Sequence, residues 1–442
     1  MKPLHIKDTF KNLMDTHLPD DSLRGRMAKG TFWSLCGTLA LQASALLTSI
    51  LNARILDAGG FGEFNLLRST ILMFGVLAGS GLGVLATKYV AEYRNKEPEV
   101  AGDRLSFLIR VAYFIGTFGT LVCALLASPI AIVTMKSPSL VVPILIGSAL
   151  LLLNAIYGIQ IGTLCGLEAF RTVSRLMVFD AFFNLVFIPI GAFLWGVPGA
   201  IGGTVLASAA GFPMRQLAMV RGCQRNHIPL HYRKDTKHFF EMFQTIVPSL
   251  LLGIAFYPFE WLAKLFIVRH PHGFSQLGIF AAAYSFGTMI AFVPNQLMST
   301  SQSLFGNLFG KKDTQSIREF AVFNVALSGG SALLVALVIG LGSNYLMGAF
   351  GRNFSNAGSV LAILSCANVF FALLIPYHRI AVTHNRLWAQ TFFSAFAGLS
   401  LVTAAFFLVD KGAFGLAVSY LIAWFLMFTV ESGFIWKLFK NH

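Results

Sequence analysis

Charged residues are scarce in this sequence, and that scarcity restricts its class. Of 442 residues only 12% are Asp, Glu, Lys or Arg, whereas 56% are hydrophobic. The mean hydropathy is +0.70. A soluble helical protein needs polar faces on its surface helices, but the apolar runs here are long enough to cross hydrocarbon and recur along the whole length. The composition therefore excludes a soluble globular fold.

Cysteine and histidine are too few and too scattered to build a disulfide framework or a zinc site. The five cysteines include no CxxC pair, and their number is odd. His227, His231 and His238 gather in one basic stretch, but Pro229 interrupts the first pair, so the three do not share a helical face. We therefore expect no metal and no cofactor.

The sequence also lacks a long polar connection that could form a catalytic domain. The longest connection, about Arg221 to Phe240, is a basic linker, and the outer connections run to roughly 15 residues or fewer. The glycines from Gly79 to Gly83 have the spacing of a phosphate loop without the preceding strand, so close helix packing explains them better. We therefore expect a protein that is not an enzyme.

Apolar segments of roughly 20 residues follow one another along the chain, and each can span a bilayer. The first 29 residues lack an apolar core with a small-residue cleavage site, so we expect a soluble tail and not a signal peptide. The sequence predicts an all-α polytopic membrane protein with about twelve transmembrane helices, near 30–51, 65–88, 105–127, 140–163, 173–194, 198–219, 243–268, 277–303, 319–341, 357–379, 387–408 and 413–436.

The two halves of the chain echo one another at an offset of 216 residues. The matched pairs are Gly62/Gly278, Phe64/Phe280, Ser69/Ser285, Leu185/Leu401, Val186/Val402, Gly196/Gly412 and Gly199/Gly415. Two lobes of six helices in the same orientation are the layout of a transporter with a path between the lobes. The predicted domains are a tail (1–29), an N-lobe (30–220), a linker (221–242), a C-lobe (243–437) and a C-terminal tail (438–442).

Basic residues are concentrated in alternate connections. The opposite connections hold only five: Arg54, Lys136, Arg269, Arg352 and Lys411. By the positive-inside rule, and with an even number of helices, both termini and the linker are predicted to be cytoplasmic. The net charge of +14 then follows from short cytoplasmic loops beside anionic lipid, and we expect no binding of nucleic acid.

Polar side chains form stripes on two predicted helices. Each stripe spans about 60–80° of arc at 100° per residue. Hydroxyls can also bond to neighbouring backbones in ordinary packing, but stripes of this length favour a wet lumen. The stripe on helix 1 comprises Ser34, Thr38, Gln42, Ser49 and Asn52, and the stripe on helix 8 comprises Thr288, Asn295, Ser299 and Gln302.

Under the 216-residue offset, Asn295 and Ser299 overlie Gly79 and Gly83. Equivalent helix faces are thus polar in one half and small in the other. We expect the path to take its polarity from this asymmetry, whereas the matched glycines are predicted to serve turns and helix ends.

Ionisable residues inside the predicted helices carry a second signal, because a charge in hydrocarbon usually faces water or a partner. Arg68 lies about one turn into predicted helix 2, and Asp180 lies in helix 5. Glu260 and Lys264 in helix 7 are spaced i,i+4 and can pair. We predict that Arg68 and Lys264 are cationic residues of the lumen and that Asp180 and Glu260 are candidate coupling carboxylates.

Three stretches of the first hundred residues resemble a known family. They are G-T-F-W-S-L-C-G-T-L from Gly30, A-R-I-L-D-A-G-G-F-G-E-F from Ala53 and A-G-S-G-L-G-V-L-A-T-K-Y-V-A-E from Ala78. They resemble the polysaccharide transporter family, the Wzx-type flippases of lipid-linked oligosaccharides. That family belongs to the multidrug/oligosaccharidyl-lipid/polysaccharide (MOP) flippase superfamily, with the multidrug and toxin extrusion (MATE) transporters.

The resemblance implies a MATE-like fold and a flippase of the bacterial cytoplasmic membrane. Such proteins move undecaprenyl-pyrophosphate-linked repeat units to the outer leaflet for O-antigen, capsule or exopolysaccharide synthesis. The implied partners are a polyprenyl-pyrophosphate-linked oligosaccharide, the lipid bilayer and other polysaccharide assembly proteins. Alternating access is implied, with coupling to H⁺ or Na⁺ left open. Arg68 and Lys264 would attract the anionic headgroup, and the two polar stripes would line its path.

Two other functions stay open. A MATE-type cation-coupled drug antiporter shares the architecture, but it usually carries an acidic residue in helix 1, and 30–51 contains none. A membrane-embedded glycosyltransferase or polysaccharide polymerase uses the same lipid substrate, but it usually needs a sizeable outer loop.

Overall fold

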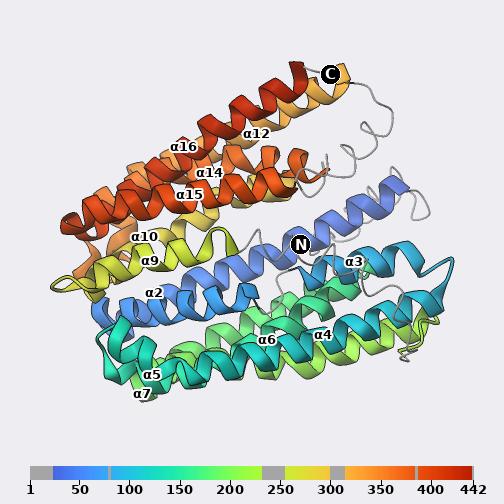
Figure 1. The fold of residues 1–442 in the computed structure, drawn as a ribbon, viewed down its shortest axis with the longest axis horizontal. Helices are drawn as coiled ribbons and strands as arrows, with labels where there is room; N and C mark the ends of the chain where they lie inside the picture. The colour runs from blue at the N-terminus through green and yellow to red at the C-terminus, as the bar shows by residue number, and fades with distance from the viewer. Residues whose placement is uncertain (1–22, 78–80, 231–253, 299–313, 384–386, 441–442) are drawn as a thin grey trace, which may run out of the picture.

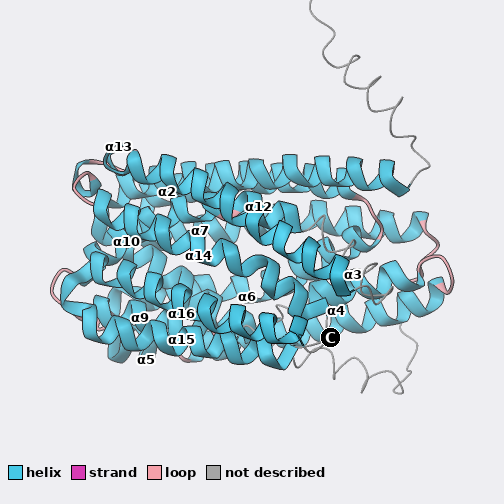
Figure 2. Cartoon of the chain, turned by 90° about the horizontal axis from the view of Figure 1, so that it is seen from above, coloured by secondary structure: helices cyan, strands magenta, loops and turns pink. Residues whose placement is uncertain are grey.

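The computed structural model describes residues 23–77, 81–230, 254–298, 314–383 and 387–440, and these residues are almost entirely helical, with no strand among them (Figure 2). Eight segments within them are long and apolar enough to cross a membrane. Three of the eight, Phe32–Gly75, Phe170–Arg225 and Trp388–Phe434, each contain a sharp break and therefore two helices. The prediction of an all-α protein with about twelve membrane-spanning helices is confirmed.

The first half of the chain forms the N-lobe. Its long helices α2 and α7 break at Asp57 (φ 56°) and Gly196 (φ 60°), so each supplies two crossings. The elements are α2 (Leu23–Leu77), α3 (Leu82–Tyr93), α4 (Pro98–Leu125), α5 (Ala127–Pro129), η1 (Ile130–Thr134), η2 (Pro138–Leu140), α6 (Val141–Gly166) and α7 (Phe170–Arg225).

The second half forms the C-lobe. Helical residues continue beyond α10 to Met298. The elements are α9 (Tyr257–Val268), α10 (Gly273–Ile290), α12 (Thr314–Leu341), α13 (Ser343–Gly348), η3 (Arg352–Phe354), α14 (Gly358–Thr383), α15 (Leu387–Leu408), η4 (Val409–Lys411) and α16 (Gly412–Lys440).

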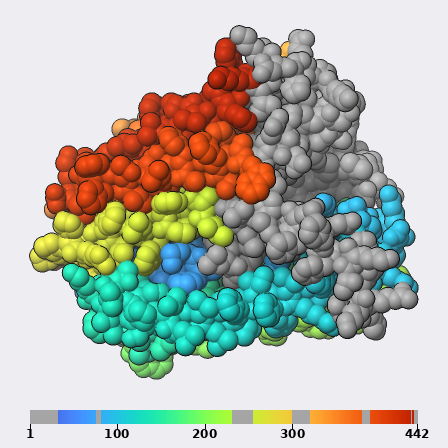
Figure 3. All heavy atoms as spheres, in the orientation of Figure 1, coloured from blue at the N-terminus to red at the C-terminus, as the bar shows by residue number. Residues whose placement is uncertain are grey.

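The two lobes lie side by side and form a V. In Figure 1 they converge at the left, beside the α9–α10 turn, and diverge toward the right, where α16 ends. Figure 3 shows α9 and α10 (yellow) seated between the cyan-green N-lobe and the orange-red helices of the C-lobe. We call the left-hand side of Figure 1, where the lobes converge, the closed end.

Helices α2 and α10 cross so closely that only glycine fits at their contact. A Cβ on Gly62 would overlap the carbonyl of Phe274, and a Cβ on Gly278 would overlap the carbonyl of Ala58. Gly62 and Gly278 are one of the pairs at the 216-residue offset, so equivalent residues of the two lobes face each other. Our prediction that this pair serves turns is wrong, because small residues are needed here for backbones to approach.

One other matched pair of glycines does mark turns. Gly196 (φ 60°, ψ −138°) and Gly412 (φ 57°, ψ −132°) adopt nearly the same left-handed conformation at equivalent breaks, which glycine reaches without steric cost. The predicted close packing at Gly83 is also confirmed, because a Cβ there would collide with Gly158 of α6. The duplication read from the sequence therefore corresponds to equivalent structural positions.

The second helix starts earlier than we predicted from the sequence. We predicted it near residue 65, but the helix follows directly on the break at Asp57. Arg68 consequently lies about three turns into the helix, and not one. The predicted helices leave residues 52–64 as a connection, whereas Gly62 in this stretch lies at the α2–α10 crossing.

The crossing generates a testable prediction. Replacing Gly62 with Ala places a methyl group against the Phe274 carbonyl and should lower the free energy of unfolding by about 1–3 kcal/mol. Thermal unfolding of the purified protein in detergent measures the effect. Gly202→Ala is the control, since a Cβ at Gly202 meets nothing within 4 Å. Equal stability of the two variants would contradict the assignment of a tight crossing.

Candidate functional site

A cavity of about 1010 Å³ lies between the two lobes. Its walls come from α2, α3, α6 and α7 of the N-lobe and from α9 and α10 of the C-lobe. This volume reaches the upper end of the roughly 300–1,000 Å³ common for small-molecule sites. Its polar and charged lining residues are Gln42, Ser49, Asn65, Arg68, Ser69, Thr87, Asn154, Tyr157, Thr204, Ser208, Tyr257, Glu260, Lys264, Tyr284, Ser285 and Thr288.

Six of the site residues predicted from the sequence line this cavity. They come from both lobes and from separate parts of the chain, so the fold brings together what the sequence placed on four different helices. Whether they contact a substrate stays a prediction. The six are Gln42, Ser49, Arg68, Glu260, Lys264 and Thr288.

The remaining stripe residues lie elsewhere. Ser34 and Thr38 are outside the cavity lining, and the Thr38 hydroxyl donates to the Ser34 carbonyl at 2.8 Å. Asn295 is exposed beyond α10, also outside the lining, and its amide donates to the Ala291 carbonyl at 2.9 Å. Asn295, which overlies Gly79 at the 216-residue offset, therefore does not supply the polarity of this cavity, contrary to our expectation. Ser299 and Gln302 lie outside the described residues.

Asn52 also departs from expectation. We predicted that it faces a wet lumen, but its exposed fraction is 0%, and neither side-chain polar atom has a hydrogen-bond partner. Asn52 lies only two residues from Arg54, which contacts the C-lobe at the closed end. The face of α2 that is open at Gln42 is thus covered where the lobes converge.

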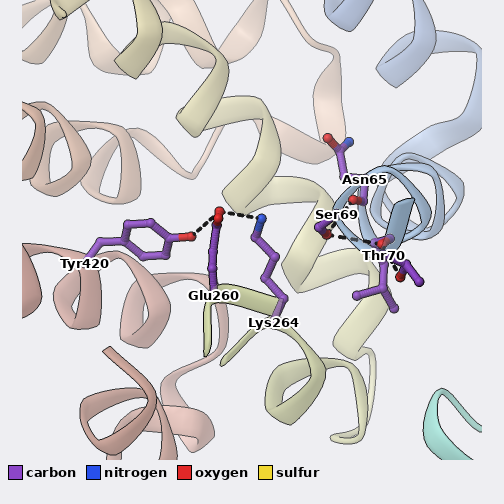
Figure 4. A network of polar contacts seen from close by, with 7 residues as sticks. Asn65, Ser69, Thr70, Glu260, Lys264 and Tyr420 are labelled. Carbon is purple, nitrogen blue, oxygen red and sulfur yellow. Dashed lines mark hydrogen bonds and ion pairs between the residues drawn. The ribbon is translucent and has the colours of Figure 1, made fainter. Parts of the chain in front are cut away.

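The C-lobe wall holds a charge pair that is internally compensated. Lys264 donates to Glu260 at 2.8 Å, and the hydroxyl of Tyr420 on α16 donates to the same Glu260 oxygen, also at 2.8 Å (Figure 4). The exposed fractions of the Lys264 and Glu260 side chains are 14% and 9%. The predicted i,i+4 pairing is confirmed, and it leaves little net charge on this wall.

Arg68 stands apart from this pair. Its side chain is exposed on the cavity wall, and its guanidinium lies 5.7 Å from the centre of the Phe64 ring. Within the described part of the chain, Arg68 forms no ion pair with a carboxylate. A planar guanidinium without a carboxylate partner among the described residues, on the wall of a cavity, is suited to bind an anion with two or more oxygens.

Asp180 lies behind the N-lobe wall and not on it. It is buried and accepts a hydrogen bond from Arg215, which also donates to Gln160 at 3.2 Å and to the Ser208 carbonyl at 2.8 Å. The Arg215 guanidinium lies 4.9 Å from the centre of the Tyr157 ring. Because Tyr157 and Ser208 line the cavity, the network supports the wall from inside the lobe. Arg215 and Gln160 were missed from the sequence.

Two equivalent arginines join the lobes at the closed end. Nε of Arg54 in the N-lobe donates to the Ala349 carbonyl of the C-lobe at 2.8 Å. Nε of Arg269 in the C-lobe donates to the Thr134 carbonyl of the N-lobe at 3.0 Å. Donors and acceptors are both related by an offset of 215 residues, so the two bonds are a symmetric pair. We call them the arginine latches.

The described helices, in two lobes around a polar cavity, have the fold of solved MATE transporters. An inward-facing multidrug resistance MATE family transporter matches with a TM-score of 0.76 at 14% identity, over 90% of this chain and 96% of that one. A MOP superfamily transporter from Pyrococcus furiosus Vc1 (DSM3638) matches with a TM-score of 0.72 at 14% identity, over 93% and 94%. An outward-facing MATE family transporter gives 0.64 at 14% identity, over 95% and 97%.

Sequence comparison identifies the family. The model of the polysaccharide biosynthesis protein family matches residues 27–302, which is more than half of the chain. The chain belongs to this family. A search of curated proteins gives no match.

The arginine latches generate a prediction about access to the cavity. In the double variant Arg54→Ala/Arg269→Ala both bonds are lost. Each exposed charged contact contributes about 0.2–1 kcal/mol, so the closed end should open more often. A Ser49→Cys reporter in an otherwise cysteine-free chain should then react roughly threefold or more faster with an impermeant maleimide added on the closed-end side.

Arg352→Ala is the matched control, since Arg352 is an exposed arginine near the same end and donates no latch bond. An unchanged labelling rate in the double variant would show that the latches do not hold the lobes together.

Proposed function

We propose that this protein is a flippase that carries polyprenyl-pyrophosphate-linked oligosaccharide repeat units across the bacterial cytoplasmic membrane by alternating access. The observation that carries the proposal is Arg68, an arginine without a carboxylate partner among the described residues, on the wall of a large cavity between the lobes. Membership of the polysaccharide biosynthesis protein family supports the substrate class.

The balance of charge in the cavity favours an anionic substrate. Among the described residues, three charged ones line it: Arg68, Lys264 and Glu260. Lys264 and Glu260 neutralise each other, so the net charge of the described lining is positive. A pyrophosphate group offers the paired oxygens that a guanidinium binds through two parallel hydrogen bonds.

The same charges argue against the MATE-type drug antiporter. A cationic drug would meet Arg68 without a free carboxylate to offset it, because Glu260 already accepts from Lys264 and Tyr420. The structural similarity to MATE transporters concerns the fold, whereas the charge of the lining concerns the ligand.

The rest of the lining suits an oligosaccharide. Hydroxyl and amide groups such as Gln42, Asn65 and Asn154 supply both donors and acceptors for sugar hydroxyls. Tyrosines of both lobes add rings with a polar end. The prenyl tail stays in the lipid while the lobes part to admit the headgroup.

The V shape of the two lobes supports entry of the substrate from the cytoplasmic side of the membrane. With the termini in the cytoplasm, as the positive-inside rule predicts, the closed end faces outward and the cavity opens toward the cytoplasm, where repeat units are assembled. The higher TM-score with an inward-facing relative, 0.76 against 0.64 for an outward-facing one, agrees with this state. Release of the arginine latches would then accompany the turn to the outward-open state.

Coupling to an ion would act through the paired carboxylates. Protonation of Glu260 would free Lys264 for the pyrophosphate, so uptake of a proton and binding of the anion would assist each other. Asp180 stays a second candidate, held by Arg215 behind the wall. Flipping that persists unchanged in both Asp180→Asn and Glu260→Gln would rule out both as coupling groups.

The role of Arg68 can be tested directly. Arg68→Gln should slow the flipping of a fluorescent lipid-linked oligosaccharide in proteoliposomes at least about tenfold, because a hydrogen bond between charged groups contributes about 1.5–3 kcal/mol. Arg68→Lys keeps the charge without the planar fork and should retain part of the rate. Arg175→Gln, which changes an exposed arginine outside the cavity, is the control. Normal flipping by Arg68→Gln at normal protein levels would remove Arg68 from the path.

The pairing of Glu260 with Lys264 predicts a gain on mutation. Glu260→Gln leaves Lys264 uncompensated and should tighten binding of the lipid-linked oligosaccharide roughly three- to tenfold, about 1 kcal/mol in a partly wet site. The double variant Glu260→Gln/Lys264→Gln should lose that gain. Equilibrium binding in detergent measures both. Unchanged affinity in the single variant would show that Lys264 does not contact the headgroup.

A further inference from the structure

Glu431 on α16 is a carboxylate buried inside the C-lobe, outside the lining of the cavity. Its exposed fraction is 0%, and neither of its oxygens accepts a hydrogen bond. Its ionic neighbour is His378 on α14, whose Nε2 lies 3.4 Å from Glu431 Oε2. Burying an ionised carboxylate without a partner costs several kcal/mol. A neutral imidazole beside Glu431 would not offset that cost, because it carries no positive charge.

Aromatic side chains frame this pair. Phe428 and Phe434 lie three residues on either side of Glu431 along α16. Phe428 stacks on Tyr377 of α14 at 6.2 Å, and Phe434 meets Phe393 of α15 edge to face at 5.3 Å. The carboxylate therefore sits between three helices in apolar surroundings, which strengthen the need for a compensating proton.

The described groups on the neighbouring helices are neutral, apolar or exposed. On α15, one turn from Phe393, Gln390 is a buried neutral amide whose oxygen has no partner. Where α12 and the helical residues beyond α10 pack against this part of the lobe, they contribute apolar residues such as Ala321 and Met298. Glu319 on α12 is exposed and has an interaction of its own. Among the described residues, His378 alone pairs with Glu431 within 4.0 Å.

His378 also connects the buried carboxylate to the surface of the lobe. Its side chain is 29% exposed, whereas that of Glu431 is 0% exposed. An imidazole can accept a proton at one nitrogen and pass one from the other. The pair thus has a buried acceptor and a wet entrance, which a purely structural ion pair does not need.

We infer that His378 and Glu431 form a proton-binding site in the C-lobe, separate from the cavity, and that the pair shares one proton in this state. The ligand is a proton and not Na⁺, because hard cations prefer sites built from oxygen ligands. Within the described residues, moreover, no cluster of three or more His, Cys, Asp or Glu side chains could hold a metal ion.

The site has a mechanical connection to the cavity, and this part of the inference rests on the proposed function. The helix that carries Glu431 also carries Tyr420, which donates to Glu260 on the cavity wall. The two residues are about 16 Å apart along α16 at 1.5 Å per residue. Loss of the proton would leave a buried charge, so α14 or α16 must move to admit water, and that movement reaches Glu260.

Proton counting tests the site without any substrate. The purified protein in detergent is titrated from roughly pH 5 to roughly pH 8, the range over which histidine pairs exchange protons, and proton release is measured with an indicator dye. Wild-type protein should release about one proton per molecule more than the double variant His378→Gln/Glu431→Gln, which keeps neither group of the pair. Each single variant keeps one titratable group and should release its proton over a different pH interval from the pair. Thermal unfolding confirms that all three variants are folded.

Asp410→Asn is the matched control. Asp410 lies 3.8 Å from His270, but its side chain is 88% exposed, so this second histidine–carboxylate pair is in water and its removal should leave the proton count unchanged. Equal proton release by the wild type and the double variant His378→Gln/Glu431→Gln would overturn the inference. Binding of ²²Na⁺ that is lost in Glu431→Gln would overturn it too, by making the site a sodium site.

Flipping assays then separate the two proposals. If the site couples to transport, Glu431→Gln should flatten the dependence of the flipping rate on pH while some flipping remains. A normal pH profile together with the lost proton would remove the connection through α16 and keep the site. Absence of flipping in wild type, with the proton count as predicted, would overturn the proposed function and leave the proton site in place.

Discussion

In hydrocarbon every charge needs either a partner or water, and the arrangement of this molecule follows from how its ionisable residues meet that need. Asp180 is held by Arg215, Glu260 by Lys264, and Glu431 lies against His378. Arg68 has no carboxylate partner among the described residues, and its need is met by exposure to the cavity between the lobes. These three carboxylates are thereby confined to the walls and the lobe interiors, and the described lining of the cavity keeps the positive charge of Arg68, which suits the anionic headgroup that we propose as substrate.

The symmetry of the fold serves the same end. Gly62 and Gly278 let α2 and α10 cross at backbone distance, and Arg54 and Arg269 bond across the closed end. Both contacts join equivalent positions of the two lobes, and in the alternating access that we propose the lobes would rock about this shared crossing. The cavity, in contrast, is asymmetric, because Arg68 comes from one lobe and the compensated Glu260–Lys264 pair from the other.

The sequence predicted the fold well because a bilayer accepts only structures that satisfy their own backbone, and apolar length then counts the helices. It failed where tertiary contact decides. The predicted helices leave residues 52–64 as a connection, because the contact of Gly62 with α10 cannot be read from the sequence. Asn52 shares a helical face with Gln42, yet the convergence of the lobes covers one and not the other. Arg215 and Glu431 lie inside predicted helices and could have been noted as ionisable, but their partners could not.

The central claim is that the cavity moves an anionic headgroup. The most direct measurement compares, in proteoliposomes of the wild-type protein, the transbilayer movement of two lipids with the same prenyl tail and the same oligosaccharide. One carries a pyrophosphate linkage and the other an uncharged linkage. The account predicts that the protein accelerates the pyrophosphate-linked lipid well above the uncharged one and above protein-free liposomes. Equal acceleration of both lipids, or of neither, would contradict it.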